Sequence, residues 1–170
     1  MKITGHAAVF NSRSVDLGGF REIIAPGAFA RTLRDGHPVF AVHHHSMADV
    51  LGSTRSGTLK LSEDSRGLHF DLALPDSSLG RDIHELVRRG DLASMSFSFF
   101  INGAAGEKWR ETSSGEIERT LIDVSLVEIS TVALPAYPAS TVSARTATHD
   151  NQAARNRMLR RFMASRLEAA

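Results

Sequence analysis

Alternating apolar and polar residues run through most of the chain and predict short β-strands. Side chains of a strand point to its two faces in turn, so a period of two marks a strand with one buried face. The clearest case is ASMSFSFF at residues 93–100, where the serines share one face and Met95, Phe97 and Phe99 share the other. Further strands or hairpins are predicted at ITGHAAVF, FREII, PVFAVHHH, GTLKLSEDSRGLHFDLAL, GEKWRETSSGEIERTLIDV and SLVEISTVAL.

Two segments have helical rather than strand periodicity. In SSLGRDIHELVRRG, residues 77–90, the apolar residues fall on one helix face, a serine can cap the start, and Gly90 can end the helix. APGAFARTLRDG, residues 25–36, has Pro26 in its first turn and Gly36 just past its end. Many short antiparallel strands with two helices predict a mainly β fold, a closed or nearly closed antiparallel β-barrel with helices around it.

The composition changes at about residue 143, and this change predicts two parts of the chain. Residues 1–142 are expected to form one domain, and residues 143–170 a flexible linker followed by a basic amphipathic helix. In the last segment, NQAARNRMLRRFMASRLEAA, methionine, leucine and phenylalanine recur at helical spacing among arginines. This pattern is typical either of a solvated terminal helix or of a helix that docks onto an acidic protein surface.

Overall composition narrows the class of protein. Hydrophobic residues make up 42% and charged residues 23%, as in soluble globular proteins. The net charge of +1 argues against nucleic acid or an anionic membrane as a partner, although a nucleic-acid-binding module built on the basic tail is an alternative. The absence of cysteine excludes disulfides and a thiol nucleophile. No apolar run approaches the roughly 20 residues of a membrane span, so we expect an intracellular protein.

Serine, histidine and carboxylate residues together suggest nucleophilic catalysis. A serine hydroxyl needs a base such as histidine to take its proton, and the base needs a carboxylate to orient it. Three consecutive histidines occupy 43–45, and the strand at 93–100 displays serines. Glu128 lies inside an apolar run and needs a partner there, either such a histidine or an arginine in a salt bridge. Asp123 is the alternative acid, which would face the other side of a continuous strand.

The same histidines allow a zinc hydrolase as an alternative. His43 and His45 would share a face of a strand, and His37 or a carboxylate could add a ligand. The sequence has neither an HExxH helix nor any Cys–His spacing. We therefore predict no metal site and no cofactor.

Six segments carry a recognisable combination when they are taken in order: GHAAVFN, FREIIAPGAFARTL, HHHSMADVLGST, GTLKLSEDSRGLHFDLALPDS, MSFSF and LIDVSLVEISTVALPAYPAS. In this order they resemble the prohead maturation serine proteases of tailed bacteriophages, which are related to the herpesvirus assemblins. The most specific pair is IAPGAF with EISTVALPAYP. The resemblance implies an assemblin-like antiparallel β-barrel with surrounding helices, and the activity of a serine endopeptidase.

The resemblance also selects three catalytic residues. The family's histidine precedes a Val-Leu-Gly and is similar in place to His45; its serine, between methionine and an aromatic residue, matches Ser96; and the glutamate of its E-[VI]-S stretch matches Glu128. The sequence departs from the family pattern at Ser46, where an acidic residue is usual, and at Ser98, where glycine is usual.

By the same resemblance, the substrates are the scaffold protein, the scaffold-like segment of the major capsid protein, and the protease itself. These capsid and scaffold proteins would be its partners, together with further copies of the chain in a homo-oligomer. The site of action would be the assembling procapsid in the bacterial host cytoplasm. An inactive structural or scaffold protein of the same fold is the alternative function.

Overall fold

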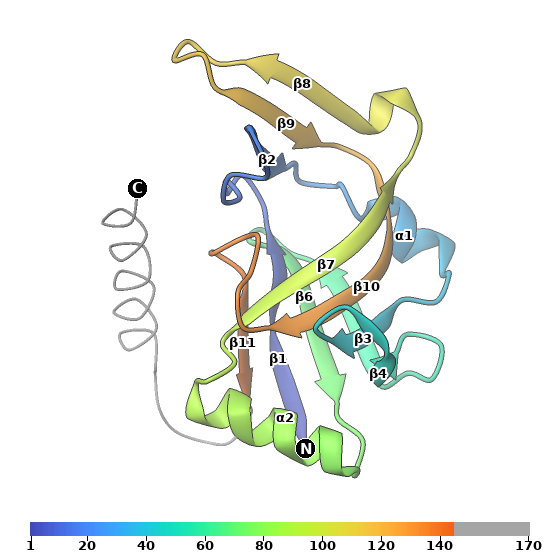
Figure 1. Ribbon diagram of the computed structural model, residues 1–170. Helices are drawn as coiled ribbons and strands as arrows, with labels where there is room; N and C mark the ends of the chain where they lie inside the picture. The colour runs from blue at the N-terminus through green and yellow to red at the C-terminus, as the bar shows by residue number, and fades with distance from the viewer. Residues whose placement is uncertain (145–170) are drawn as a thin grey trace, which may run out of the picture.

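The computed structural model of the protein describes residues 1–144, which fold into three β-sheets with two α-helices and a short 3-10 helix (Figure 1). The strands are β1 (Lys2–Val9), β2 (Phe20–Ile24), β3 (Phe40–His43), β4 (Ser46–Ser53), β5 (Leu59–Glu63), β6 (Gly67–Ala73), β7 (Ser94–Ile101), β8 (Glu107–Glu111), β9 (Ile117–Leu121), β10 (Val124–Val132) and β11 (Thr141–Ala144). The helices are α1 (Ala30–Asp35), α2 (Ser78–Arg89) and η1 (Ala104–Gly106).

The first sheet has the order β11-β1-β6-β5 and is antiparallel throughout. It contains the hairpin predicted from the alternating leucines, with Leu59 opposite Leu72 and Leu61 opposite Phe70. The approach of β11 to β1 requires a glycine, because a Cβ added at Gly5 would lie 2.0 Å from the carbonyl oxygen of Thr141. The prediction of β5 and β6 from the sequence pattern is confirmed. The pattern did not predict β11.

The second sheet has the order β4-β3-β10-β7 and combines two kinds of pairing. Strand β3 runs parallel to β10, and β10 runs antiparallel to β7. In the second pairing Ser96 lies opposite Ser130, and Ser98 lies opposite Glu128. Directly opposed residues share a face of the sheet, so these four side chains lie on one face.

The predicted two-faced character of β7 is confirmed. Met95 is 1% and Phe97 is 7% exposed, and both belong to the hydrophobic core. The ring of Phe97 contacts the rings of Phe29, Phe99 and Tyr137. The aromatic face therefore anchors the strand, and this leaves the serine face available for other contacts.

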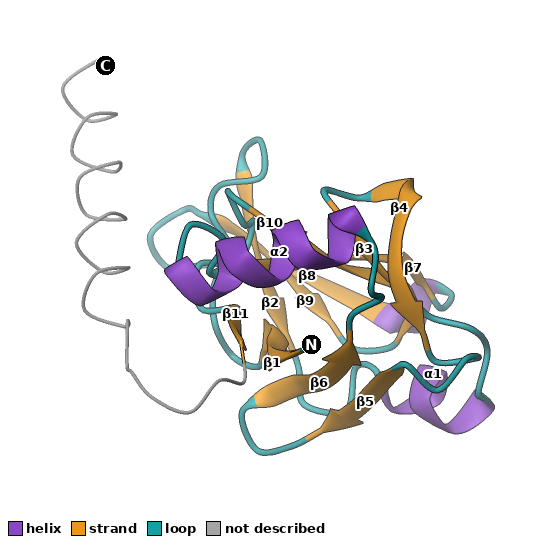
Figure 2. Cartoon of the chain, turned by 90° about the horizontal axis from the view of Figure 1, so that it is seen from below, coloured by secondary structure: helices purple, strands orange, loops and turns teal. Residues whose placement is uncertain are grey.

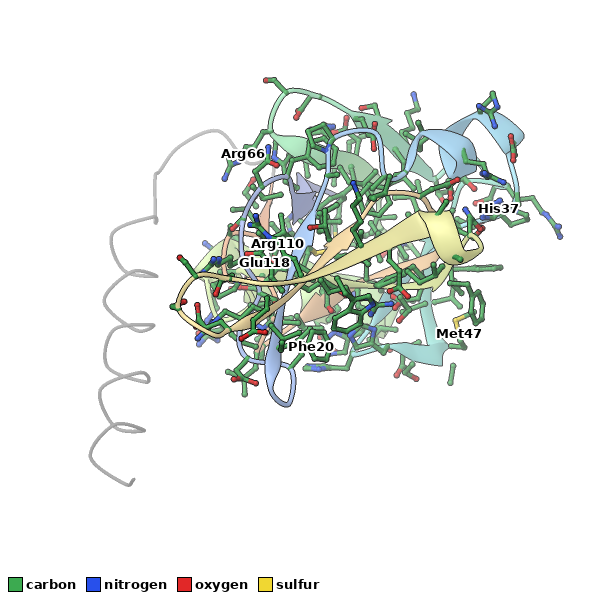
Figure 3. All side chains as sticks on the ribbon, turned by 90° about the horizontal axis from the view of Figure 1, so that it is seen from above. Phe20, His37, Met47, Arg66, Arg110 and Glu118 are labelled. Atoms are coloured by element: carbon green, nitrogen blue, oxygen red, sulfur yellow. The ribbon has the colours of Figure 1, made fainter. Side chains whose placement is uncertain are left out.

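The third sheet has the order β2-β9-β8 and extends from one end of the molecule, as Figure 1 shows for β8 and β9. The predicted β8–β9 hairpin is confirmed, and β2 joins it in parallel. Arg110 and Glu118 lie next to each other in Figure 3, with a distance of 2.6 Å between Nε of Arg110 and Oε1 of Glu118. Ion pairs between these strands therefore support this sheet where it leaves the core.

Residues 1–144 do not form a closed antiparallel barrel. The mainly β character is confirmed, but the strands divide into three open sheets, and two of the strand pairs are parallel. The first and second sheets meet near β11 and β7, where the N–H of Val142 donates to the carbonyl of Ala93 at 3.3 Å. In the described residues β11 and β7 are not paired as neighbouring strands, so this contact does not provide the continuous ladder that barrel closure requires.

Both predicted helices are present, but only α2 has the predicted ends. Helix α2 has the predicted ends, because the Ser77 hydroxyl accepts from the N–H of Gly80 at 3.1 Å and Gly90 adopts a left-handed conformation. It lies across one end of the molecule and contacts β1, β4 and β11 (Figure 2). Helix α1 begins only at Ala30, because Gly27 has a φ of 87° and places Pro26 in a turn before the helix.

Strand β4 was also not predicted. It follows the histidine triplet and pairs with β3 through two register shifts, an irregular pairing that leaves no clean alternation in the sequence. Strand β11 continues to Ala144, two residues beyond the predicted end of the domain at residue 142. The rest of the predicted linker and the terminal helix lie outside the described residues.

Candidate active site

The histidine triplet forms the turn between β3 and β4. His43 ends β3. His44 and His45 have φ values of 49° and 60°, which residues other than glycine rarely adopt. The N–H of His44 donates to the carbonyl of Thr131 at 3.1 Å, and the N–H of His45 donates to the Ser130 hydroxyl at 3.0 Å. The expectation that His43 and His45 share a strand face is wrong, because the chain leaves the strand at His44.

Glu128 and His45 form a direct pair. Oε1 of Glu128 lies 2.7 Å from Nδ1 of His45, and Oε2 of Glu128 accepts from the Ser130 hydroxyl at 2.5 Å. The Glu128 side chain is 4% exposed, whereas the His45 side chain is 42% exposed. The carboxylate is therefore held inside the protein while the imidazole remains accessible, and among residues 1–144 Glu128 pairs with His45 rather than with an arginine.

Asp123 lies elsewhere, just before β10. Its Oδ1 accepts from the Asn102 amide at 2.8 Å, and its Oδ2 accepts from Arg31 at 2.5 Å. The Asn102 hydrogen bond, and after it the Arg31 guanidinium, hold the pKa of Asp123 below its usual value. Asp123 therefore has its own partners and makes no contact with His45.

Three serines surround the His45–Glu128 pair. The Ser98 and Ser130 hydroxyls lie 3.3 and 3.4 Å from Nδ1 of His45. Ser96 is 8% exposed and lies opposite Ser130 on the same face. Within residues 1–144 no hydrogen bond joins Ser96 to His45, so the sheet register brings Ser96 beside the pair without a direct contact.

The other histidines of the zinc alternative have separate partners. Nδ1 of His43 lies 2.9 Å from the Thr131 hydroxyl, and burial, followed by the neighbouring His44, lowers the pKa of His43. Nε2 of His37 donates to the carbonyl of Leu126 at 3.0 Å. Among the described residues, no three histidine, aspartate or glutamate side chains are grouped as ligands of a metal ion.

This geometry is suited to activating a hydroxyl group. Glu128 occupies Nδ1 of His45 and leaves Nε2 as the nitrogen that can accept a proton. Sequence reasoning selected His45 and Glu128, which the structure brings into contact, but did not select Ser130, whose signal was its position two residues after Glu128 on the same strand face. No helix in the described part of the chain has the length and apolar character needed to span a membrane.

Comparison with known proteins gives a family match and structural neighbours among viral proteases. The family model described as caudovirus prohead serine protease matches residues 1–155. The varicella-zoster virus protease is 16% identical with a TM-score of 0.46, and the match covers 83% of this chain but only 62% of that protein. The KSHV protease in complex with a hexapeptide phosphonate inhibitor is 15% identical with a TM-score of 0.49, covering 99% of this chain and 78% of that one. No curated protein matches the sequence.

Proposed function

Because this chain belongs to the caudovirus prohead serine protease family, we propose that it is the endopeptidase that cleaves the scaffold protein or the scaffold-like segment of the major capsid protein during procapsid maturation. The observation that carries the proposal is the buried Glu128 carboxylate on Nδ1 of an accessible His45, on the sheet face that holds Ser96. This arrangement supports a serine nucleophile, a histidine base and an orienting acid.

In the proposed reaction, Nε2 of His45 takes the proton of the Ser96 hydroxyl while Oγ attacks the carbonyl carbon of the peptide bond. The imidazolium then gives this proton to the leaving amine as the C–N bond breaks, and an acyl-enzyme remains on Ser96. A water molecule, deprotonated by His45, attacks the ester and releases the acid, and Oγ recovers its proton. Glu128 accepts the Nδ1–H throughout and stabilises the imidazolium.

Ser98 is the competing nucleophile, because its hydroxyl is the one within 3.3 Å of His45. The nitrogen it approaches is Nδ1, which lies 2.7 Å from the Glu128 carboxylate. A nitrogen that donates its proton to a carboxylate has no free lone pair to accept a serine proton. We therefore assign the nucleophile to Ser96 and its base to the free Nε2.

Co-expression with the capsid precursor tests the assignment, with the intact mass of the capsid protein as the readout. The wild type should shorten the precursor by one defined N-terminal segment, Ser96→Ala should leave it whole, and the matched Ser98→Ala should still shorten it. The reverse result would move the nucleophile to Ser98. Identical precursor masses with wild type and Ser96→Ala would favour the alternative function, an inactive structural or scaffold protein.

We also propose that the protease acts inside the assembling procapsid in the host cytoplasm, with capsid and scaffold proteins and further copies of itself as partners. The tail is proposed to recruit it. Deleting residues 145–170, all beyond β11, should preserve hydrolysis of a peptide that spans the cleavage site but stop incorporation into procapsids, measured by quantitative blotting of purified particles. Normal packaging of the truncated protein would exclude the tail as the targeting element.

A further inference from the structure

Ser130 makes the hydrogen bonds that connect the proposed base to its acid. It is fully buried in β10, at 0% exposure, directly opposite Ser96. We propose that Ser130 is a positioning residue that holds both His45 and Glu128 in their reactive arrangement. The inference rests on the proposed function, and it adds a residue that acts through the other two without touching the substrate.

The hydrogen bonds of Ser130 use both capacities of a hydroxyl group. Its single proton goes to Oε2 of Glu128 at 2.5 Å, and its oxygen accepts the backbone N–H of His45 at 3.0 Å. The same atom thus contacts the side chain of the acid and the main chain of the base. Any change in the position of one of these groups is transmitted to the other through Ser130.

The contact with Glu128 fixes the direction of the carboxylate. The last torsion of a glutamate side chain is broad, so the carboxylate of an unrestrained glutamate turns easily. With Oε2 held by the Ser130 hydroxyl, the other oxygen remains 2.7 Å from Nδ1 of His45. The hydroxyl therefore keeps the lone pairs of Oε1 directed at the imidazole.

The contact with His45 supports an unfavourable backbone conformation. Left-handed conformations at His44 and His45 cost free energy for residues with a Cβ atom. The Ser130 hydroxyl accepts a hydrogen bond from the backbone N–H of His45, and this bond offsets part of that cost. The turn is thus stabilised at His45, the residue whose imidazole must be placed accurately for proton transfer.

Three variants test this role. Ser130→Ala removes both hydrogen bonds, and Ser130→Thr keeps the hydroxyl group. Thr32→Val is the matched control, because Thr32 is also buried and its hydroxyl makes two hydrogen bonds to the same strand, to the carbonyl of Val124 and the N–H of Leu126. Each variant is treated with a fluorophosphonate reagent that labels activated serines, and the labelling rate of Ser96 is followed by peptide mass mapping.

We expect Ser130→Ala to lower the labelling rate about 10- to 100-fold, which corresponds to one lost hydrogen bond to a charged group. Ser130→Thr should recover most of the rate, and Thr32→Val should leave it close to that of the wild type. The Nδ1–H resonance of His45 in the proton NMR spectrum, assigned by its loss in His45→Ala, should shift or broaden only in Ser130→Ala.

The readouts separate failure of this inference from failure of the proposed function. Absent labelling of Ser96 in the wild type would reject the proposed function, and the NMR resonance would still report whether Ser130 orients the pair. A Ser130→Ala variant with unchanged labelling and an unchanged resonance would overturn the inference. The inference would also be overturned if Ser130→Ala lowers the labelling rate, leaves the Nδ1–H resonance of His45 unmoved, and is not rescued by Ser130→Thr. The loss of rate would then come from altered packing.

Discussion

Replacing Glu128 by glutamine tests the proposed triad with little change in volume. The two carboxylate oxygens each face a donor, Nδ1 of His45 and the hydroxyl of Ser130. A carboxamide has one accepting end and one donating end, so it cannot serve both donors as the carboxylate does. The substitution therefore changes the hydrogen-bond pattern of a site that is otherwise preserved.

Both orientations of the amide impair the base. If the amide oxygen accepts from Ser130, the NH₂ group faces Nδ1 and imposes the tautomer with a proton on Nε2, which cannot take a proton from Ser96. If the amide is turned, Nδ1 keeps its acceptor, but the negative charge that stabilises the imidazolium is gone. The Ser130 hydroxyl favours the first orientation, because its oxygen already accepts from the N–H of His45.

We expect Glu128→Gln to lower kcat about 10⁴-fold, as the corresponding amide substitution does in another serine protease triad. This loss corresponds to about 5 kcal/mol of transition-state stabilisation. The assay is steady-state hydrolysis of a peptide spanning the capsid cleavage site, with a thermal melt to verify folding. Asp123→Asn is the control, because Asp123 binds Arg31 and Asn102 instead.

The control variant should retain a kcat close to that of the wild type. The reasoning is refuted if Glu128→Gln stays within about tenfold of the wild type, since a lost charge and a wrong tautomer cannot cost so little. An equally damaging Asp123→Asn would also refute the assignment of the acid to Glu128.

Two further predictions concern stability. The hydrogen bond from His6 holds the pKa of Asp64 at about 2, so this stabilisation is present above pH 3.8 and is lost as the pH falls through 2. The Tm difference between wild type and Asp64→Asn should therefore shrink as the pH falls below 3.8 and vanish only below pH 2. At higher pH it should correspond to a difference of under about 1 kcal/mol in the free energy of unfolding, because the pair is exposed. Phe29→Ala should cost about 3–5 kcal/mol in urea unfolding, because Phe29 is fully buried between Phe10 and Phe97; a cost below about 1 kcal/mol would contradict this packing.

Much of the local structure could be predicted because its causes are local. The alternation of serine with Met95, Phe97 and Phe99 identified β7 and its buried face. Ser77 or Ser78, together with Gly90, marked the ends of α2, and the structure places the cap at Ser77. Strand β4 escaped prediction because its register shifts interrupt the alternation on which such predictions depend. The shorter α1 likewise reflects the turn conformation of Gly27, which periodicity does not reveal.

The sequence by itself determined which residue types could form the candidate site. A histidine triplet, a serine-bearing strand and a carboxylate in an apolar run were all visible, and the family resemblance selected His45, Ser96 and Glu128 from them. Those choices depend on chemistry and on short spacings, which a linear pattern contains. Asp123 remained open as the acid because its partners, Arg31 and Asn102, are brought to it only by folding.

Only the tertiary structure decided which groups meet. His45 reaches Glu128 because the chain turns at His44 and because β3 pairs in parallel with β10, a strand more than eighty residues away in the sequence. The same register brings Ser130 into contact with both. Pairing between strands so far apart depends on the whole core and on how the sheets pack, for which no local pattern carries a signal. For the same reason the three open sheets could not be told from a closed barrel before the strands were placed.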